Sequence, residues 1–171
     1  MSLSAELADL FRRDLTRLRQ QLQTFGDGEI LWRTLPGVSN SAGNLMLHLE
    51  GNLREFVGRQ LGAVAYERNR PQEFAGTGVP VAELLARIEE LTVLIPRVIA
   101  DLSDAQLEAK YPQDALGLPL STRAFLIHLN GHLNYHLGQI DYLRRILTEG
   151  KAVNYAALSS REGPEPASSP S

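Results

Sequence analysis

The chain of 171 residues contains no cysteine. Disulfide bonds, thiolate metal ligands and a cysteine nucleophile are therefore excluded. Any bound metal ion would have to be held by imidazole, carboxylate, amide or water. No apolar run approaches the roughly 18 residues that a membrane-spanning helix needs, and the N-terminal segment MSLSAELADLFRRD is amphipathic rather than signal-like. We therefore expect a soluble, cytoplasmic protein that has no membrane partner.

The chain also has no excess of positive charge, with 17 lysines and arginines against 20 acidic residues. The formal net charge is −3 at pH 7, which argues against a nucleic-acid partner because such surfaces are normally basic. The sequence has no P-loop, no G-x-G-x-x-G motif and no Ser-His-Asp signature. Its 43% of hydrophobic and 22% of charged residues are ordinary for a globular protein. The length suits one domain with a core of its own.

The spacing of apolar residues predicts four long helices and no strand. These helices cover residues 4–25, 41–61, about 80–102 and 121–149. Ser39 or Asn40 is expected to cap the second helix, and Ser121 the fourth. Residues 63–80 form a polar crossover that is too long for a tight turn. The pattern predicts an all-α protein, a four-helix bundle with a long crossover between its second and third helices.

We expect the bundle to occupy residues 1–158. The segment 159–171 is rich in serine and proline and is expected to be a flexible tail. The apolar third helix, which contains Pro96, would offer a reasonable face for a dimer.

The chain has four histidines, and three of them follow one another at every fourth position of the predicted fourth helix: His128, His132 and His136. A step of four residues turns a helix only about 40° beyond a full circle, so the three side chains share one face. His128 and His136 are about 12 Å apart along the helix axis and cannot bind the same ion. A metal ion would therefore take either the first two or the last two.

The apolar stripe of the fourth helix favours the last two. On a helical wheel His132 and His136 lie on the core side, whereas His128 lies on its flank. His128 is a candidate for supporting the site or contacting substrate, and the alternative is a structural or surface residue. His48, in the predicted second helix, lies at the edge of another apolar face. We therefore predict a metal site formed by His48, His132 and His136, with a position left open for water or substrate. The alternative is that these histidines are polar residues of a metal-free core.

Further polar residues lie near these histidines in the sequence. Gln139, Tyr135, Glu50 and Glu55 are candidates for orienting an imidazole or handling a proton. The sequence does not choose among them.

Three segments resemble a known family: WRTLPGVSNSAGNLMLHLEGNLREFV, ERNRPQEF and HLNGHLNYHLGQIDYLRRIL. They are similar to the DinB-like (YfiT-like) family of metalloenzymes, and closest to its branch of uncharacterised bacterial proteins with an H-x3-H-x3-H-x-GQI motif. This resemblance covers roughly residues 1–150. It implies an up-down-down-up four-helix bundle and a divalent ion, zinc or nickel, bound by one histidine of the second helix and two of the fourth. Matched by motif, these are His48, His132 and His136.

The resemblance also implies activities and partners. Characterised members include S-transferases and isomerases that use low-molecular-weight thiols, and homodimers are common. The leading hypothesis is a metal-dependent transferase or hydrolase that activates a small thiol or water for attack on a small-molecule substrate. Arg68, Arg70 and Glu73 of the crossover are candidates for binding an anionic group or the cosubstrate. The alternative is a non-catalytic metal- or ligand-binding bundle, including a dimeric, stress-related module.

Overall fold

The computed structural model describes residues 1–26, 28–114 and 117–153. Within these ranges the regular structure is helical, apart from one isolated β-bridge between Lys110 and Ser121. The prediction of an all-α protein is therefore confirmed. In the same ranges no helix is both long enough and apolar enough to cross a membrane. The predicted tail at 159–171 lies outside the described residues.

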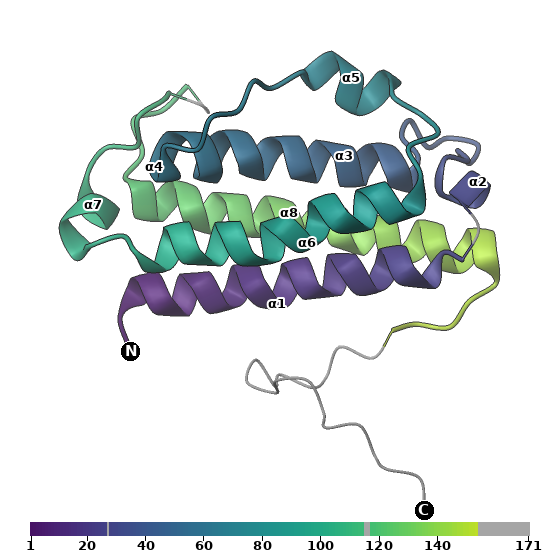
Figure 1. The fold of residues 1–171 in the computed structure, drawn as a ribbon, viewed down its shortest axis with the longest axis horizontal. Helices are drawn as coiled ribbons and strands as arrows, with labels where there is room; N and C mark the ends of the chain where they lie inside the picture. The colour runs from purple at the N-terminus through teal and green to yellow at the C-terminus, as the bar shows by residue number, and fades with distance from the viewer. Residues whose placement is uncertain (27, 115–116, 154–171) are drawn as a thin grey trace, which may run out of the picture.

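Four long helical runs lie side by side (Figure 1). They are α1 (Leu3–Thr24), a run made of α3 (Ala42–Leu53), η1 (Arg54–Arg59) and α4 (Gln60–Gly62), then α6 (Val81–Ala100), and α8 (Thr122–Thr148). The shorter helices α2 (Gly28–Leu31), α5 (Arg70–Ala75) and α7 (Asp104–Glu108) lie in the connections. The ends of the four runs agree with the sequence prediction to within two residues, because local caps and apolar spacing define them.

Side-chain caps explain where three of the long helices begin. The hydroxyls of Ser2 and Ser121 accept hydrogen bonds from the amides of Ala5 and Ala124, as expected of N-caps. Helix α3 is capped by Ser41 instead of the predicted Ser39 or Asn40. Ser41 is the serine whose hydroxyl reaches the backbone amide three residues further on, which is the geometry that a cap requires.

The second long run contains a π-helical segment, η1, that the sequence did not indicate. The hydroxyl of Tyr111 donates a 2.7 Å hydrogen bond to the carbonyl of Phe56 within this segment. In the wider π-helical turn the carbonyls are poorly aligned for the usual i to i−4 hydrogen bonds. The buried phenol of Tyr111 therefore supplies a hydrogen bond to a carbonyl that is poorly bonded within the helix.

Helices α1 and α6 pack against each other along their apolar stripes. Ile88, Leu91 and Ile95 of α6 are fully buried, and Pro96 is buried as well. This apolar stripe is therefore not available to a partner, and the dimer face expected on this helix stays a prediction. That stripe is used inside the chain, where burial of each such side chain contributes about 1.5–3 kcal/mol.

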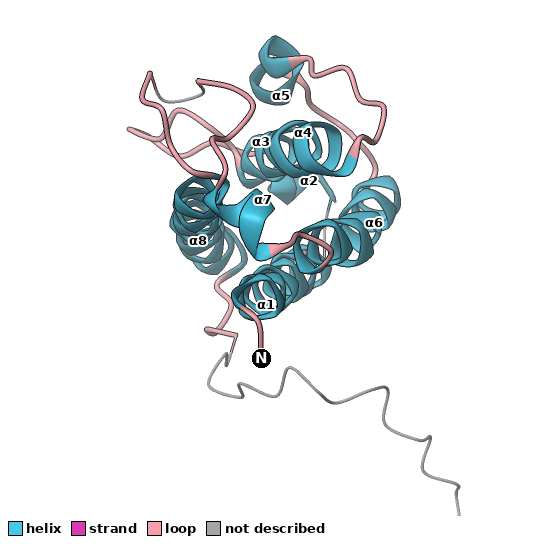
Figure 2. Cartoon of the chain, turned by 90° about the vertical axis from the view of Figure 1, so that its left-hand side faces the viewer, coloured by secondary structure: helices cyan, strands magenta, loops and turns pink. Residues whose placement is uncertain are grey.

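The predicted polar crossover 63–80 contains a helix, α5, which lies on the outer side of α3 (Figure 2). Asn69 caps its first turn through its side-chain oxygen, and Pro71 occupies that turn. The side-chain nitrogen Nδ2 of Asn44, on α3, donates hydrogen bonds to the backbone carbonyls of Glu73, Phe74 and Gly76. Their lengths are 3.2, 3.2 and 2.8 Å. These three bonds hold the C-terminal end of α5 against α3.

Candidate metal centre

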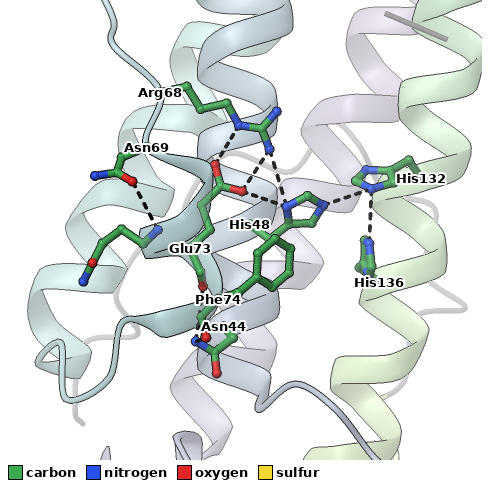
Figure 3. A network of polar contacts seen from close by, with 9 residues as sticks. Asn44, His48, Arg68, Asn69, Glu73, Phe74, His132 and His136 are labelled. Carbon is green, nitrogen blue, oxygen red and sulfur yellow. Dashed lines mark hydrogen bonds and ion pairs between the residues drawn. The ribbon is translucent and has the colours of Figure 1, made fainter. Parts of the chain in front are cut away.

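Three histidines from two helices meet between α3 and α8 (Figure 3). Nε2 of His132 lies 3.2 Å from Nε2 of His48 and 3.1 Å from Nε2 of His136. The three ring nitrogens lie within 4.8 Å of one another. The structure therefore brings together the three residues that the sequence singled out.

The partners of the outer ring nitrogens fix the protonation of two of these rings. Nδ1 of His48 donates a 2.8 Å hydrogen bond to Oε2 of Glu73, since a carboxylate oxygen only accepts. Nδ1 of His136 lies 2.7 Å from Oε1 of Gln139, which is also an acceptor. In a neutral imidazole with a proton on Nδ1, Nε2 carries a lone pair. Both lone pairs consequently face Nε2 of His132.

His132 supplies the third ring, but it cannot donate a hydrogen bond to both facing lone pairs. A proton on its Nε2 could form a hydrogen bond with only one of the two facing lone pairs. Its Nδ1 is buried and has no hydrogen-bond partner among the described residues. A cation placed among the three Nε2 atoms would bind all three lone pairs at once, with the proton of His132 on Nδ1.

The spacing fits a transition-metal ion. Zinc–imidazole bonds of 2.0–2.1 Å in tetrahedral geometry place ligand nitrogens about 3.3 Å apart, close to the distances of 3.1 and 3.2 Å found here. Three protein ligands leave one tetrahedral position open, as in catalytic zinc sites. The residues present therefore fit a divalent ion.

The electrostatic surroundings keep the three rings neutral, which is the form that binds metal. Burial, together with the neighbouring His136 and His48, lowers the pKa of His132 to about 4. Burial is also the main cause that lowers the pKa of His48, against the opposing effect of Glu73. Burial lowers the pKa of His136 too, against its hydrogen bond to Gln139.

Glu73 connects the crossover to the metal centre. Its buried carboxylate accepts hydrogen bonds from Arg68, Nε to Oε1 at 2.7 Å and Nη2 to Oε2 at 2.9 Å, while Oε2 also accepts from His48. Gly51 on α3 makes room for this carboxylate, because a Cβ there would overlap Oε1 of Glu73. The sequence assigned Glu73 and Arg68 to ligand recognition, and the structure places Glu73 behind His48 as the residue that orients its ring.

The other candidate residues occupy different places. Gln139 contacts His136 as described, and the exposed Tyr135 lies with its ring 5.2 Å from that of His136. His128 is not among the three converging rings and stacks on Phe125 at 6.0 Å. Arg70 lies over the ring of Phe74, 5.2 Å from its centroid.

Glu50 and Glu55 do not contact the histidines through any hydrogen bond in the described part of the chain. Glu50 accepts from Arg54 and Arg87, and Glu55 binds Arg59. Both carboxylates are therefore used in ion pairs with arginines, and neither orients an imidazole, contrary to the prediction.

A cavity of about 250 Å³ opens beside the metal centre. His48 and His132 form part of its wall. Asn52, Arg68, Arg70 and His128 supply its other polar groups. The remaining lining residues are Phe56, Phe125 and Leu129. A small molecule in this cavity would therefore reach two of the three histidines and lie near two guanidinium groups.

Three contributors to this site were not predicted from the sequence. Asn44 anchors α5, Gly51 admits the Glu73 carboxylate, and the ring of Phe74 lies 4.9 Å from that of His48. The glycine directly after His48-Leu49-Glu50 was the only signal available, since a glycine inside a helix often marks a close approach.

Comparison with known proteins adds one finding. The sequence model of the DinB superfamily matches residues 10–140, a range that includes His48, His132 and His136. No protein with a curated description matches the chain.

Proposed function

The chain belongs to the DinB superfamily, and from this premise we propose that it is a divalent-metal-dependent enzyme that activates a small thiol or water for attack on a small electrophile. One observation carries the proposal: three Nε2 atoms converge, and Glu73 and Gln139 turn two of their lone pairs toward the same point. Zinc or nickel is the proposed ion, because neutral imidazole suits both.

A divalent ion bound there would act as a Lewis acid that lowers the pKa of a thiol or a water molecule. Since the chain has no cysteine, a thiol must come from a cosubstrate. In the transfer, the sulfur or oxygen forms a bond to the electrophilic carbon and the leaving group departs with its bonding electrons. The nucleophile's proton needs an acceptor, and we assign that role to His128, which lines the same cavity.

The cavity also indicates the charge of the ligand. Arg68 already shares its charge with Glu73, whereas Arg70 lines the same cavity and has a ring contact with Phe74. An anionic group on the thiol or the electrophile would pair with these cations. We therefore propose a small anionic cosubstrate, such as a carboxylate-bearing thiol.

The directions of the helices support the bundle topology that the resemblance implies. In Figure 1 the colours run one way along α1 and α8 and the opposite way along α3 and α6, and α5 lies in the connection that returns the chain between α3 and α6. An up-down-down-up bundle with a long crossover is accordingly part of the proposal.

A second candidate function follows from the burial of the cluster. Neutral, half-buried imidazoles held by fixed partners also suit a non-catalytic site in which metal stabilises or regulates the bundle. Such a protein would lose thermal stability when a ligand is removed but would have no turnover to lose.

Elemental analysis of tag-free protein tests whether the chain binds a metal ion. We expect about one zinc or nickel ion per chain in the wild type and none in His132→Ala. The matched control is His128→Ala, which removes an imidazole from the same helix face and should keep the metal. Absence of metal in the wild type, even after both ions are offered, would refute the proposal.

A screen for turnover tests whether the metal-bound protein is an enzyme. A screen of low-molecular-weight thiols with alkylating electrophiles and of small ester and amide substrates should yield an activity that His136→Ala abolishes. His128→Ala should retain the metal and reduce that activity. Full metal loading with no turnover on any of these substrates would favour the non-catalytic site.

A further inference from the structure

The cavity beside the metal centre lies between two helical runs and the crossover. One wall is formed by the second helical run, on which His48, Asn52 and Phe56 follow one another at every fourth residue. The opposite wall is formed by side chains of α8, namely Phe125, His128, Leu129 and His132. Arg68 and Arg70 of the crossover form a third side. His48 is at one end of its row, so a ligand that reaches the metal centre extends from there past Asn52 toward Phe56.

Asn52, in the middle of the first wall, has an unsatisfied side-chain amide. The residue is only 7% exposed, and its Oδ1 is buried without a hydrogen-bond partner among the described residues. A buried amide without a partner costs free energy, because folding removes its hydrogen bonds to water without replacing them. Since Asn52 lines the cavity, a molecule that enters the cavity can supply the missing partner.

The chemistry of the amide defines this partner. A half turn about the Cβ–Cγ bond exchanges Oδ1 with Nδ2, so the side chain of Asn52 can either accept or donate a hydrogen bond toward the cavity. A hydroxyl or an amide of a ligand can also do both. A ligand that has only hydrogen or a methyl group at this position would leave Asn52 unbonded, and a site built for a hydrogen bond discriminates against such a ligand.

The charge of the cavity restricts the partner further. None of the described residues that line it is acidic, whereas two of them are the arginines Arg68 and Arg70. An ammonium group would be repelled by these cations and would meet no carboxylate in the lining, whereas a carboxylate would be attracted. The cavity has a volume of about 250 Å³, so the anionic group and the neutral hydrogen-bonding group of the ligand must lie close together.

We propose that Asn52 determines the ligand specificity of this cavity, and that the ligand is a small carboxylate with a hydroxyl or amide group on the neighbouring carbon. The amide of Asn52 binds that group while the arginines attract the carboxylate. This inference rests on the proposed function in taking the cavity beside the histidines as the ligand site. It does not depend on the metal ion, because Asn52 is not one of the three converging side chains.

Binding of three matched thiol carboxylates to the full chain tests the proposal. The probes are 3-mercaptopropionate, its 2-hydroxy derivative and N-acetylcysteine, which carry hydrogen, a hydroxyl and an acetamido group on the same carbon. The chain has no cysteine, so the probes cannot form mixed disulfides with it. NMR titration gives their dissociation constants for zinc-loaded protein and for protein stripped of metal by a chelator.

The wild type should prefer the two probes that can bond to Asn52. We expect the hydroxy and acetamido probes to bind about 3- to 10-fold more tightly than 3-mercaptopropionate, which is the effect of one neutral hydrogen bond. Free L-cysteine, which has an ammonium group at that position, should bind no more tightly than 3-mercaptopropionate. The ratios should be the same with and without zinc.

Asn52→Leu should abolish this preference, because leucine is branched at the same position as asparagine but has no hydrogen-bonding group. The ratios of the dissociation constants should fall to about one. Asn52→Ala is a second variant with the same expectation and no added bulk. Both should keep the melting temperature of the wild type to within a few degrees, since Oδ1 has no partner in the described part of the chain.

Two controls separate the roles of the lining residues. Asn40→Leu makes the same replacement in the loop before α3, outside the lining of this cavity, and should keep the preference. Arg70→Gln removes a cation from the lining and should weaken the binding of all three probes without changing their ratios.

Three results would overturn the proposal: no binding of any probe, equal binding of the three probes by the wild type, or a preference that persists in both variants of Asn52. Failure of the wild type to bind zinc or nickel would instead refute the proposed function, and the ratios measured without metal would be unaffected.

Discussion

Nδ1 of His48 donates a hydrogen bond of 2.8 Å to Oε2 of Glu73, a residue 25 positions later in the chain. This bond places the proton of the His48 ring on its outer nitrogen and leaves Nε2 free to bind a cation. Metal-binding histidines commonly have such a carboxylate partner, and its loss typically lowers metal affinity 10- to 100-fold.

Replacing Glu73 should therefore weaken metal binding without removing a ligand. We expect Glu73→Gln to raise the dissociation constant for zinc by about 10- to 100-fold, because an amide neither carries the charge that Arg68 pairs with nor accepts as strongly from His48. Competition with a chromophoric chelator measures the constant. Glu67→Gln is the control, since Glu67 is exposed in the same crossover. Equal affinities for the two variants would contradict the role given to Glu73.

A second variant, Gly51→Ala on α3, should displace the carboxylate of Glu73. The new Cβ would overlap Oε1 of Glu73, and we expect the carboxylate, as the end of a flexible side chain, to move away from His48. Zinc affinity should fall by about tenfold or more, while the apo protein should lose no more than about 1–3 kcal/mol of stability. Gly58→Ala on the same helical run is the control, because its Cβ would make only an ordinary contact of 3.6 Å with Leu94. An unchanged affinity in Gly51→Ala would mean that the position of Glu73 does not matter.

Bound metal should stabilise the folded state, and the gain in free energy of unfolding should grow with the ratio of metal concentration to dissociation constant. Zinc at 100 times its dissociation constant contributes about 2.7 kcal/mol, which corresponds to a rise in melting temperature of about 5–10 °C for a chain of this size. Differential scanning fluorimetry with and without zinc measures this shift. His132→Ala should show no shift and His128→Ala should show the full one. A metal-free core would give no shift in the wild type.

A buried carboxylate outside the metal centre should make stability depend on pH. Asp14 on α1 is fully buried and accepts hydrogen bonds from Arg13, Asn130 and Asn134. Burial alone would raise the pKa of Asp14, but the bonds from Arg13 and Asn134 outweigh it and lower the pKa below its usual value.

The sign of the effect follows from this direction. Since the folded-state pKa of Asp14 lies below the unfolded-state value of about 3.9, its ionised form stabilises the protein above about pH 4, and this contribution is lost as the pH falls through the folded-state pKa. Asp14→Asn should be less stable than wild type by about 1–3 kcal/mol at pH 7. In urea unfolding from pH 7 to pH 3, the gap between the two proteins should narrow below pH 4. A gap that stays constant would show that the charge of Asp14 does not stabilise the fold.

Much of the helical structure follows from local sequence. The apolar residues at spacings of three and four define α1, α6 and α8 to within two residues, because this signal acts within one or two turns. A serine cap at the start and a glycine after the end add to it in α1 and α8. The same reasoning identified His132 and His136 as the inward pair, since the wheel of one helix determines which side chains share its apolar face.

Other features depended on contacts between distant parts of the chain. The sequence pattern predicted no helix in the crossover, yet part of it forms α5, because Asn44 of α3 binds the three carbonyls at the end of that short helix. A helix of six residues is not stable by itself, so its own sequence could not predict it. The π-helical segment at 54–59 likewise coincides with a hydrogen bond from Tyr111, 55 residues away from Phe56.

Local sequence accounts for the helical character of the chain, for the helices that carry its four histidines, and for the choice of His48 and the pair on α8 as the residues able to meet. Contacts between distant residues account for how they meet: Glu73 lies behind His48, and Gly51 leaves space for its carboxylate. The physical reason is the range of the forces involved. Helix formation is governed by neighbours three or four residues apart, whereas the orientation of a ring is governed by whichever group the fold brings within about 3 Å of its nitrogen.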